Sequence, residues 1–189
     1  MIISFNGDHG SGKSTIAQMV AKELGYPRYY MGQIFRDIAK EKGITLEELH
    51  KGIVDDAAVD KLVDDYLIKL SKKENDFVVE SRTAWYFIPE SVKFYFRVDS
   101  KESAKRVFLE LQKENQRNEG VELNSIEKVE ESLDKRKKMD DERYMKFYGI
   151  NIRDDKNYDL VVNTTGLTIQ EVFERAMDFI KVKINEKSN

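Results

Sequence analysis

The chain has 189 residues, of which 40% are hydrophobic and 35% charged, and its 32 Lys and Arg against 35 Asp and Glu give a formal net charge of −3. This length predicts a single domain with its own core, and the slight acidic excess argues against a general nucleic-acid binder. With no cysteine and only two histidines, His9 and His50, the sequence excludes disulfides, thiol catalysis and cysteine-ligated zinc, and it argues against a Ser-His-Asp triad.

Short apolar segments alternate with helical patterns along the chain. Strands are predicted at residues 2–5, 29–31, 77–79, 93–98 and 158–163. Helices are predicted after residue 13, over 32–43, after 55, from 99 toward 118, over about 125–148 and after 168. Thr45 with Glu48 and Thr168 with Glu171 have the capping-box spacing of helix starts. This alternation predicts an α/β fold, with a five-stranded parallel sheet and helices on both faces.

The first predicted strand leads into a complete phosphate-binding motif. Residues 7–14 match G-x-x-x-x-G-K-[ST], between an apolar strand and a periodic helix. The glycines let backbone N–H groups turn toward an anion, and the helix N-terminus adds a favourable dipole. Lys13 is placed to reach the β- and γ-phosphates of ATP, and the Ser14 hydroxyl to ligate Mg²⁺. The predicted ATP-binding residues are Gly7, Asp8, His9, Gly10, Ser11, Gly12, Lys13, Ser14 and Thr15.

GTPases, ATPase motors and small-molecule kinases all use this motif. The chain has no Asn-Lys-x-Asp segment for reading guanine, is short for a motor, and lacks an apolar strand ending in an Asp-Glu pair. These features favour a small-molecule kinase. His9 lies inside the motif, where a residue needs only to present its backbone amide, and we do not expect it to act as an acid or base.

Four arginines and one glutamate are placed to serve a second phosphate. Arg36 lies one turn into the helix after the second predicted strand, and Arg82 directly follows the third. The carboxyl ends of parallel strands border the ligand crevice, so both are expected beside the phosphate loop. Glu80, at the tip of the third strand, is placed to hold a magnesium-bound water or to pair with Lys13. Arg136 and Arg143 project from one face of a charged helix that fits a closing lid, although surface or structural ion pairs are the alternative for each arginine.

These motifs resemble the nucleoside monophosphate kinases, most closely the archaeal-type cytidylate kinases. The resemblance spans nearly the whole chain, and the spacing of the charged segment 136–151 is its most specific element. The segments that carry it are residues 7–14, 32–36, 80–85, 136–151 and 158–164.

The resemblance implies a P-loop NTPase fold and a kinase that uses ATP and Mg²⁺ to convert CMP or dCMP to the diphosphate. It implies one domain, 1–189, in which about residues 32–76 bind the acceptor and about residues 125–153 form a helical lid. The implied catalytic residues are Lys13, Arg82, Arg136 and Arg143; the implied acceptor-binding residues are Gly32, Arg36 and Arg82; and the implied metal-binding residues are Ser14 and Glu80.

Several positions depart from the family pattern. Gln33 stands where an acid is usual, Ser81 replaces a glycine, Glu110 stands where a second arginine is common, and Met139 replaces a small residue. These departures leave the choice among CMP, dCMP and UMP open. The aromatic cluster that begins at Trp85 fits a core position better than a stacking position against a pyrimidine.

Two further functions fit the same motifs. One is another small P-loop kinase, acting on adenylate, dephospho-coenzyme A or a metabolite without a phosphate. The other is a regulatory protein that binds ATP without turning it over. Two acceptor arginines, Arg36 and Arg82, favour an acceptor that carries a phosphate.

The expected partners are ATP and a nucleoside monophosphate, with no nucleic acid and no membrane. No apolar run reaches the ~18 residues of a transmembrane helix, and the first residues lack the pattern of a signal peptide. The sequence therefore predicts a cytoplasmic protein. A monomer is expected, because one core uses all the apolar faces found above.

Overall fold

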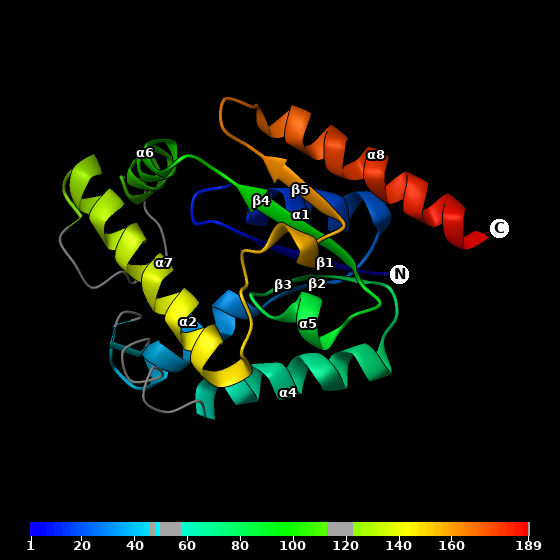
Figure 1. Ribbon diagram of the computed structural model, residues 1–189, viewed down its shortest axis with the longest axis horizontal. Helices are drawn as coiled ribbons and strands as arrows, with labels where there is room; N and C mark the ends of the chain where they lie inside the picture. The colour runs from blue at the N-terminus through cyan, green and yellow to red at the C-terminus, as the bar shows by residue number, and fades with distance from the viewer. Residues whose placement is uncertain (46–47, 50–57, 113–122, 189) are drawn as a thin grey trace.

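Five parallel strands form the centre of the molecule (Figure 1). The computed structural model describes residues 1–45, 48–49, 58–112 and 123–188. Neighbouring strands pair in the order β2-β3-β1-β4-β5, and every pairing is parallel. The sheet predicted from the sequence is therefore confirmed. Its strands are β1 (Ile2–Gly7), β2 (Arg28–Tyr30), β3 (Phe77–Glu80), β4 (Val92–Arg97) and β5 (Leu160–Asn163).

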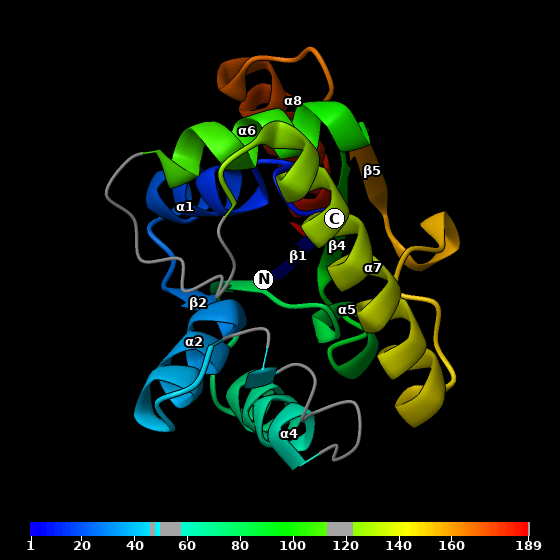
Figure 2. The ribbon, with the colours of Figure 1, turned by 90° about the vertical axis from the view of Figure 1, so that its left-hand side faces the viewer.

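Helices cover both faces of this sheet (Figures 1 and 2). Helices α1 and α8 pack on one face, while α2, α4 and α5 lie against the other. Helix α6 packs against the long helix α7 beside the sheet. The helices are α1 (Lys13–Leu24), α2 (Met31–Glu41), α4 (Ala58–Lys73), α5 (Ala84–Phe87), α6 (Ser100–Leu111), α7 (Ile126–Tyr148), η1 (Asp155–Asn157) and α8 (Ile169–Ser188).

Strand β1 supplies side chains to both hydrophobic clusters. Ile3 and Phe5 face the cluster that contains α1 and α8, whereas Ile2 faces the cluster that contains α4. Successive side chains of a strand point to opposite faces of the sheet, as they do here. Because both faces of the sheet are covered, the residues of this strand are mostly apolar. Phe5 stacks on Phe94 and Phe96 of β4, with ring centroids 4.9 and 5.5 Å apart.

The strand register determines where a ligand crevice can form. Phe5 pairs with Glu80 of β3, and Gly7 pairs with Phe96 of β4. The loop after β1 therefore starts between the carboxyl ends of β3 and β4, which is where open parallel sheets bind ligands.

The local signals for helix starts and ends are confirmed. Thr45 and Glu48 form a capping box, in which the Thr45 N–H donates to Glu48 Oε2 at 2.8 Å and the Glu48 N–H donates to Thr45 Oγ1 at 3.1 Å. The same reciprocal bonds join Thr168 and Glu171 before α8. Helix α7 ends at Gly149, which adopts the left-handed conformation favoured by glycine.

Some boundaries differ from the sequence predictions. Met31 begins α2 instead of ending β2, and its buried side chain joins the cluster beneath α4. The fifth strand starts at Leu160, because the Asp154 carboxylate caps a short 3-10 turn just before it. Helix α5 was not predicted, since four residues are too few for a helical period to be recognised. Most of the predicted extension of α6 toward residue 118 lies outside the described residues.

Within the described part of the chain, no helix is long and apolar enough to span a membrane.

Candidate active site

The phosphate loop connects β1 to α1, and two of its glycines are required by close packing. Both have positive φ angles, 156° at Gly7 and 68° at Gly10. A Cβ at Gly7 would lie 2.5 Å from the Phe96 carbonyl oxygen, and one at Gly10 would lie 2.8 Å from the Ser103 carbonyl oxygen. The loop is therefore pressed against β4 and α6 along its length, which fixes its backbone in place.

Asp8 attaches the phosphate loop to β4. Its carboxylate accepts hydrogen bonds from the Tyr95 hydroxyl at 2.8 Å and from Arg153 Nη1 at 2.8 Å. Arg153 also donates from Nε to Asp141 of α7 at 2.7 Å. Arg153 was missed in the sequence, where only its position two residues beyond the resembling segment could have drawn attention to it. It joins the phosphate loop to α7.

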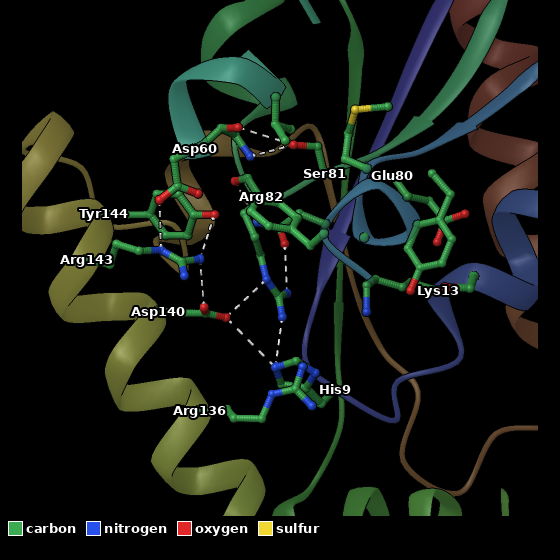
Figure 3. Close-up of a pocket in the computed structure, with 18 of the residues that line it drawn as sticks. His9, Lys13, Asp60, Glu80, Ser81, Arg82, Arg136, Asp140, Arg143 and Tyr144 are labelled. Atoms are coloured by element: carbon green, nitrogen blue, oxygen red, sulfur yellow. Dashed lines mark hydrogen bonds and ion pairs between the residues drawn. The ribbon is translucent and has the colours of Figure 1, made fainter. Parts of the chain in front are cut away.

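A pocket of about 130 Å³ lies at the carboxyl ends of β1 and β3 (Figure 3). Residues from β1, α1, α2, α4, α7 and the turn after β3 line it. It brings together most of the side chains predicted to act in phosphoryl transfer and acceptor binding. Those that line it are His9, Gly10, Lys13, Ser14, Gly32, Arg36, Glu80, Arg82, Arg136 and Arg143.

Arg82 crosses the centre of this pocket and joins the phosphate loop to α7. Its Nη1 donates to Asn6 Oδ1 at 3.2 Å and to the Gly7 carbonyl oxygen. Its Nη2 lies 3.0 Å from His9 Nε2, and its Nε lies 3.3 Å from Asp140 Oδ2 (Figure 3). All three nitrogens of the Arg82 guanidinium therefore have partners within the protein.

Asp140 of α7 was missed by the sequence analysis. It is buried between two arginines, since Arg143 Nη2 donates to its Oδ1 at 3.0 Å while Arg82 approaches its Oδ2. Burial raises the pKa of Asp140, but the charges of Arg82 and Arg143 outweigh that effect and hold the pKa well below its usual value. Its spacing of four from Arg136 and three from Arg143 places it on the same helix face, which was the available signal.

Arg143 lies between two carboxylates. Its Nε is 3.2 Å from Asp60 Oδ2 of α4, on the side opposite Asp140, and its guanidinium lies 4.8 Å from the centre of the Tyr144 ring. Burial raises the pKa of Asp60 from 3.8 to about 6, although the Arg143 charge acts in the opposite direction. Asp60 is a second residue that the sequence analysis did not identify.

Arg36 is positioned by the tyrosine that ends β2. Its Nη1 donates to the Tyr30 hydroxyl at 2.9 Å, and its guanidinium lies 5.2 Å from the centre of the same ring. A Cβ at Gly32 would lie 2.6 Å from that ring, so glycine is needed for this approach. Gln33 does not line the pocket, and its amide instead donates to Asp37 at 2.9 Å.

Glu80 and Ser14 line the same pocket as Lys13 and carry side-chain oxygen atoms. Glu80 Oε1 accepts from Arg28 Nε at 2.6 Å, whereas its Oε2 is buried without a hydrogen bond. Among the described residues, no group of three or more His, Asp or Glu side chains could hold a metal ion alone.

A second, wider groove of about 520 Å³ lies on the other side of the phosphate loop. It runs from the loop to α6 and to the start of α8, and Glu110 is among its lining residues. Arg106 also lines this groove and is held in place, because Nη2 donates to the Thr164 carbonyl oxygen at 2.9 Å and Nε donates to Glu102 at 2.9 Å. The phosphate loop thus borders two separate spaces.

His9 points away from this second groove toward Arg82. Burial lowers its pKa well below 6.5, and the charges of Arg136 and Arg82 lower it further. The imidazole is therefore neutral at pH 7, which agrees with Nε2 accepting a hydrogen bond from Arg82. Because Arg82 occupies Nε2 and burial opposes protonation of the ring, His9 is poorly placed to take up a proton, in line with the expectation that it is not an acid or base.

The His9 environment predicts a pH-dependent stability. Below pH 6.5 the unfolded chain binds a proton at this histidine and the folded chain does not, so stability falls as the pH falls, by up to about 1.4 kcal/mol per pH unit. His9→Gln should lose less thermal stability than the wild type between about pH 7.5 and about pH 5.5. Melting curves at both pH values measure this, and equal losses in the two proteins would contradict it.

Trp85 does not line the pocket. Its Nε1 donates to the Arg82 carbonyl oxygen at 2.9 Å, and its ring packs 5.7 Å from that of Tyr158. The interpretation of this aromatic cluster as packing is therefore supported.

A phosphate loop that opens a helix, on a parallel sheet with arginines across the crevice, defines a P-loop kinase. The shikimate kinase from Bacteroides thetaiotaomicron shares the fold, with a TM-score of 0.64 and 13% identity, covering 96% of this chain and 98% of its own.

The chain belongs to the cytidylate kinase-like family, whose model matches residues 2–166. It is 30% identical over 188 residues to the cytidylate kinase of Pyrobaculum calidifontis, covering 99% of this chain and 96% of that protein. It is 34% identical over 165 residues to the cytidylate kinase of Thermococcus kodakarensis, covering 87% and 79% of the two chains.

Proposed function

We propose that the protein transfers the γ-phosphoryl group of ATP to CMP or dCMP and forms the corresponding diphosphate. The observation that carries the proposal is one pocket in which Lys13 of the phosphate loop faces Arg36, Arg82 and Arg136 from three other segments. Such a cluster of cations fits two phosphate groups brought together, as phosphoryl transfer requires. Membership of the cytidylate kinase-like family supports a cytidine nucleotide as the acceptor.

Each ligand has a space of its own. The adenosine of ATP fits the wider groove beside α6, with its phosphates wrapped by the loop and reached by Lys13. The nucleoside monophosphate fits the pocket beside α2 and α4, where Arg36 is held ready by Tyr30. The two phosphate groups then meet beneath α7, whose Arg136 faces the same pocket.

The chemistry needs no general base, because the attacking oxygen belongs to an ionised phosphate. The protein instead holds the two phosphates in line and balances their charge. Arg82 would exchange its contacts to His9 or Asp140 for the acceptor phosphate, a stronger anion with more oxygens. The neutral His9 gives up such a contact without leaving a buried charge unpaired.

The pocket also suits Mg²⁺. Ser14 and the unbonded Oε2 of Glu80 are the hard oxygen atoms that this ion prefers, and Mg²⁺ at nucleotide sites uses few protein ligands. When bound, Mg²⁺ neutralises charge on the β- and γ-phosphates. Arg28 fixes the Glu80 carboxylate from its other oxygen, so Oε2 keeps its direction.

The proposal includes the roles given above to whole segments. About residues 32–76 would receive the acceptor, and about residues 125–153 would close over both phosphates as a lid. Support comes from α2, α4 and α7, each of which contributes side chains to the pocket. A cytoplasmic monomer is part of the same proposal.

The test is ADP formation from ATP and Mg²⁺, with CMP, dCMP, UMP, AMP, GMP and no acceptor compared side by side. We expect a steep rise with CMP or dCMP. A rise with AMP alone would support an adenylate kinase. Rates equal to the no-acceptor rate throughout would contradict a nucleoside monophosphate kinase and leave a metabolite kinase or a regulatory ATP-binding protein.

A further inference from the structure

Two consecutive carboxylates of α7 contact two different arginines, and each arginine in turn contacts the phosphate loop. Asp140 Oδ2 lies 3.3 Å from Arg82 Nε (Figure 3). Asp141 Oδ1 accepts a hydrogen bond from Arg153 Nε at 2.7 Å. Consecutive residues of a helix point in directions about 100° apart, so the two connections reach the loop from different sides.

The connection through Asp140 lies inside the acceptor pocket, which both Asp140 and Arg82 line. Under the proposed function, Arg82 leaves this carboxylate for the acceptor phosphate. Asp140 would remain paired, because Arg143 Nη2 donates to its Oδ1 at 3.0 Å. The middle of α7 would nevertheless lose a contact to the phosphate loop at the step in which Arg136 must lie beside the two phosphates.

The connection through Asp141 lies outside that pocket. Arg153 and Asp8 line a separate cavity of about 60 Å³, between the phosphate loop, α6 and α7. Both bonds of the Arg153 side chain to carboxylates are charge-assisted, and the side chain is only 12% exposed, so solvent screens them little. An acceptor phosphate in the other pocket does not compete for these bonds, so they remain when Arg82 turns away.

The protein holds Arg153 rigidly at both its backbone and its guanidinium. The Arg153 N–H donates to Asn151 Oδ1 at 2.9 Å, and its carbonyl oxygen accepts from Arg97 Nη2 at 3.1 Å. Arg153 Nη1 donates to Asp8 at 2.8 Å and to the Tyr95 hydroxyl at 2.9 Å. The guanidinium therefore has little freedom to move, and it fixes the position of Asp141 relative to the loop.

The two ends of α7 are attached to other helices. Val129 and Leu133 pack in a hydrophobic cluster with α6, and the Tyr148 hydroxyl donates to Asp64 of α4. These contacts keep the helix folded onto the molecule, but they do not join its middle to the phosphate loop.

We propose that Arg153 is a positioning residue that holds α7 against the phosphate loop while Arg82 binds the acceptor phosphate. The inference rests on the proposed function. Arg136 lies five residues before Asp141 on the same helix, so the bonds from Arg153 to Asp141 and Asp8 keep Arg136 at the pocket. Misplacing a group by about 1 Å costs on the order of 100-fold in rate.

The first experiment compares ADP formation from ATP and CMP in the wild type, Asp141→Asn and a matched control, Glu142→Gln. Asp141→Asn weakens the α7 end of the connection and leaves Arg153 paired with Asp8. Glu142 is the next residue of α7 and its side chain is 63% exposed, so the control makes the same charge change on the solvent side. We expect Asp141→Asn to lower kcat at least about tenfold and Glu142→Gln to stay within about twofold of the wild type.

Michaelis constants for ATP and CMP should change by less than about threefold in Asp141→Asn, because the groups that bind each ligand remain in place. A larger rise in either constant with kcat unchanged would mean that the connection serves ligand binding, and it would contradict the inference. An unchanged kcat would do the same.

A double-mutant cycle tests whether both residues act through one contact. Arg153→Lys should lower kcat about as much as Asp141→Asn, since one ammonium group cannot contact Asp8 and Asp141 through separate nitrogens. Adding Asp141→Asn to Arg153→Lys should lower kcat no further. Two reductions that multiply would show that the residues act independently and would overturn the inference. Arg153→Lys also serves alone if Asp141→Asn does not fold.

A distance measurement separates this role from a general loss of structure. The chain has no cysteine, so spin labels attached through Lys135→Cys on α7 and Asp178→Cys on α8 report these two exposed sites alone. Without ligands, Asp141→Asn should keep the narrow distance distribution of the wild type, because Asp140 still contacts Arg82. With CMP and a non-hydrolysable ATP analogue, the distribution should broaden in Asp141→Asn and stay narrow in the wild type.

Broadening already without ligands would mean that the contact is merely structural, and a narrow distribution in both states would mean that α7 does not depend on it. Either result would overturn the inference. Calorimetric titration with CMP distinguishes its failure from that of the proposed function. If CMP binds but no ADP forms, the proposed function alone fails and the distance measurement still decides the role of Arg153. Absence of CMP binding would overturn both.

Discussion

Replacing Lys13 by alanine is expected to lower kcat by about 100- to 1,000-fold at saturating ATP and CMP. Lys13 opens α1 directly after the phosphate loop and lines the pocket that the acceptor phosphate would enter. Under the proposed function, its positive charge would lie where negative charge develops on the transferred group. Among the cations of the pocket, it alone belongs to the phosphate loop itself, so no neighbouring segment can replace it.

The control for this prediction is Lys22→Ala. Lys22 lies in the last turn of α1 and is exposed, so the variant removes the same charge from the same helix. Steady-state ADP formation gives kcat for both variants. A Lys13→Ala enzyme within about tenfold of the wild type would show that charge on the transferred group is balanced elsewhere.

The phosphate loop, the individual strands and the helix caps could be predicted because each has a signal among neighbours in the sequence, and the parallel sheet followed from the alternation of strands with helices. A glycine-rich turn between an apolar strand and a helix has few other structures open to it, and Thr168 meets Glu171 within one turn. The arginines at strand ends followed from a rule about parallel sheets. The pocket contains Arg36 and Arg82 as that rule predicts.

The carboxylates of the site could not be predicted in the same way. In a chain with 35% charged residues, Asp60 and Asp140 look like parts of two solvated helix faces. They are buried because α7 lies across the pocket and brings Arg143 and Arg82 against them. Neither contact has a local pattern, since the residues of each pair are 83 and 58 positions apart in the sequence.

The contact between Arg153 and Asp8 could not be predicted either, because the two residues are 145 positions apart in the sequence. A basic residue after a lid-like helix has many structural uses, and only the folded chain shows that it reaches the phosphate loop. Tyr95 completes the contact by donating to the same carboxylate oxygen. Long-range pairs of this kind, more than the motifs, determine how the two sides of the pocket are held relative to each other.

Arg82→Ala is expected to lower kcat about 100- to 1,000-fold while ATP affinity changes little. Arg82 is the cation nearest the middle of the pocket, where it contacts Gly7, His9 and Asp140 at once. An acceptor phosphate arriving there would take over part of these contacts. The phosphate loop keeps its other anchors, since the Asp8 N–H still donates to the Phe96 carbonyl oxygen at 2.8 Å. ATP should therefore still bind.

Three measurements together test this role of Arg82. Steady-state kinetics give kcat, equilibrium titration with ATP gives its affinity, and Arg175→Ala on the exposed side of α8 serves as the matched arginine control. Arg82→Lys should recover only part of the rate, because an ammonium group keeps the charge but not the paired donors of a guanidinium. If Arg82→Ala kept near-normal kcat with CMP, Arg82 would serve only to brace the loop against α7, and Arg36 and Arg136 would be the arginines that bind the acceptor phosphate.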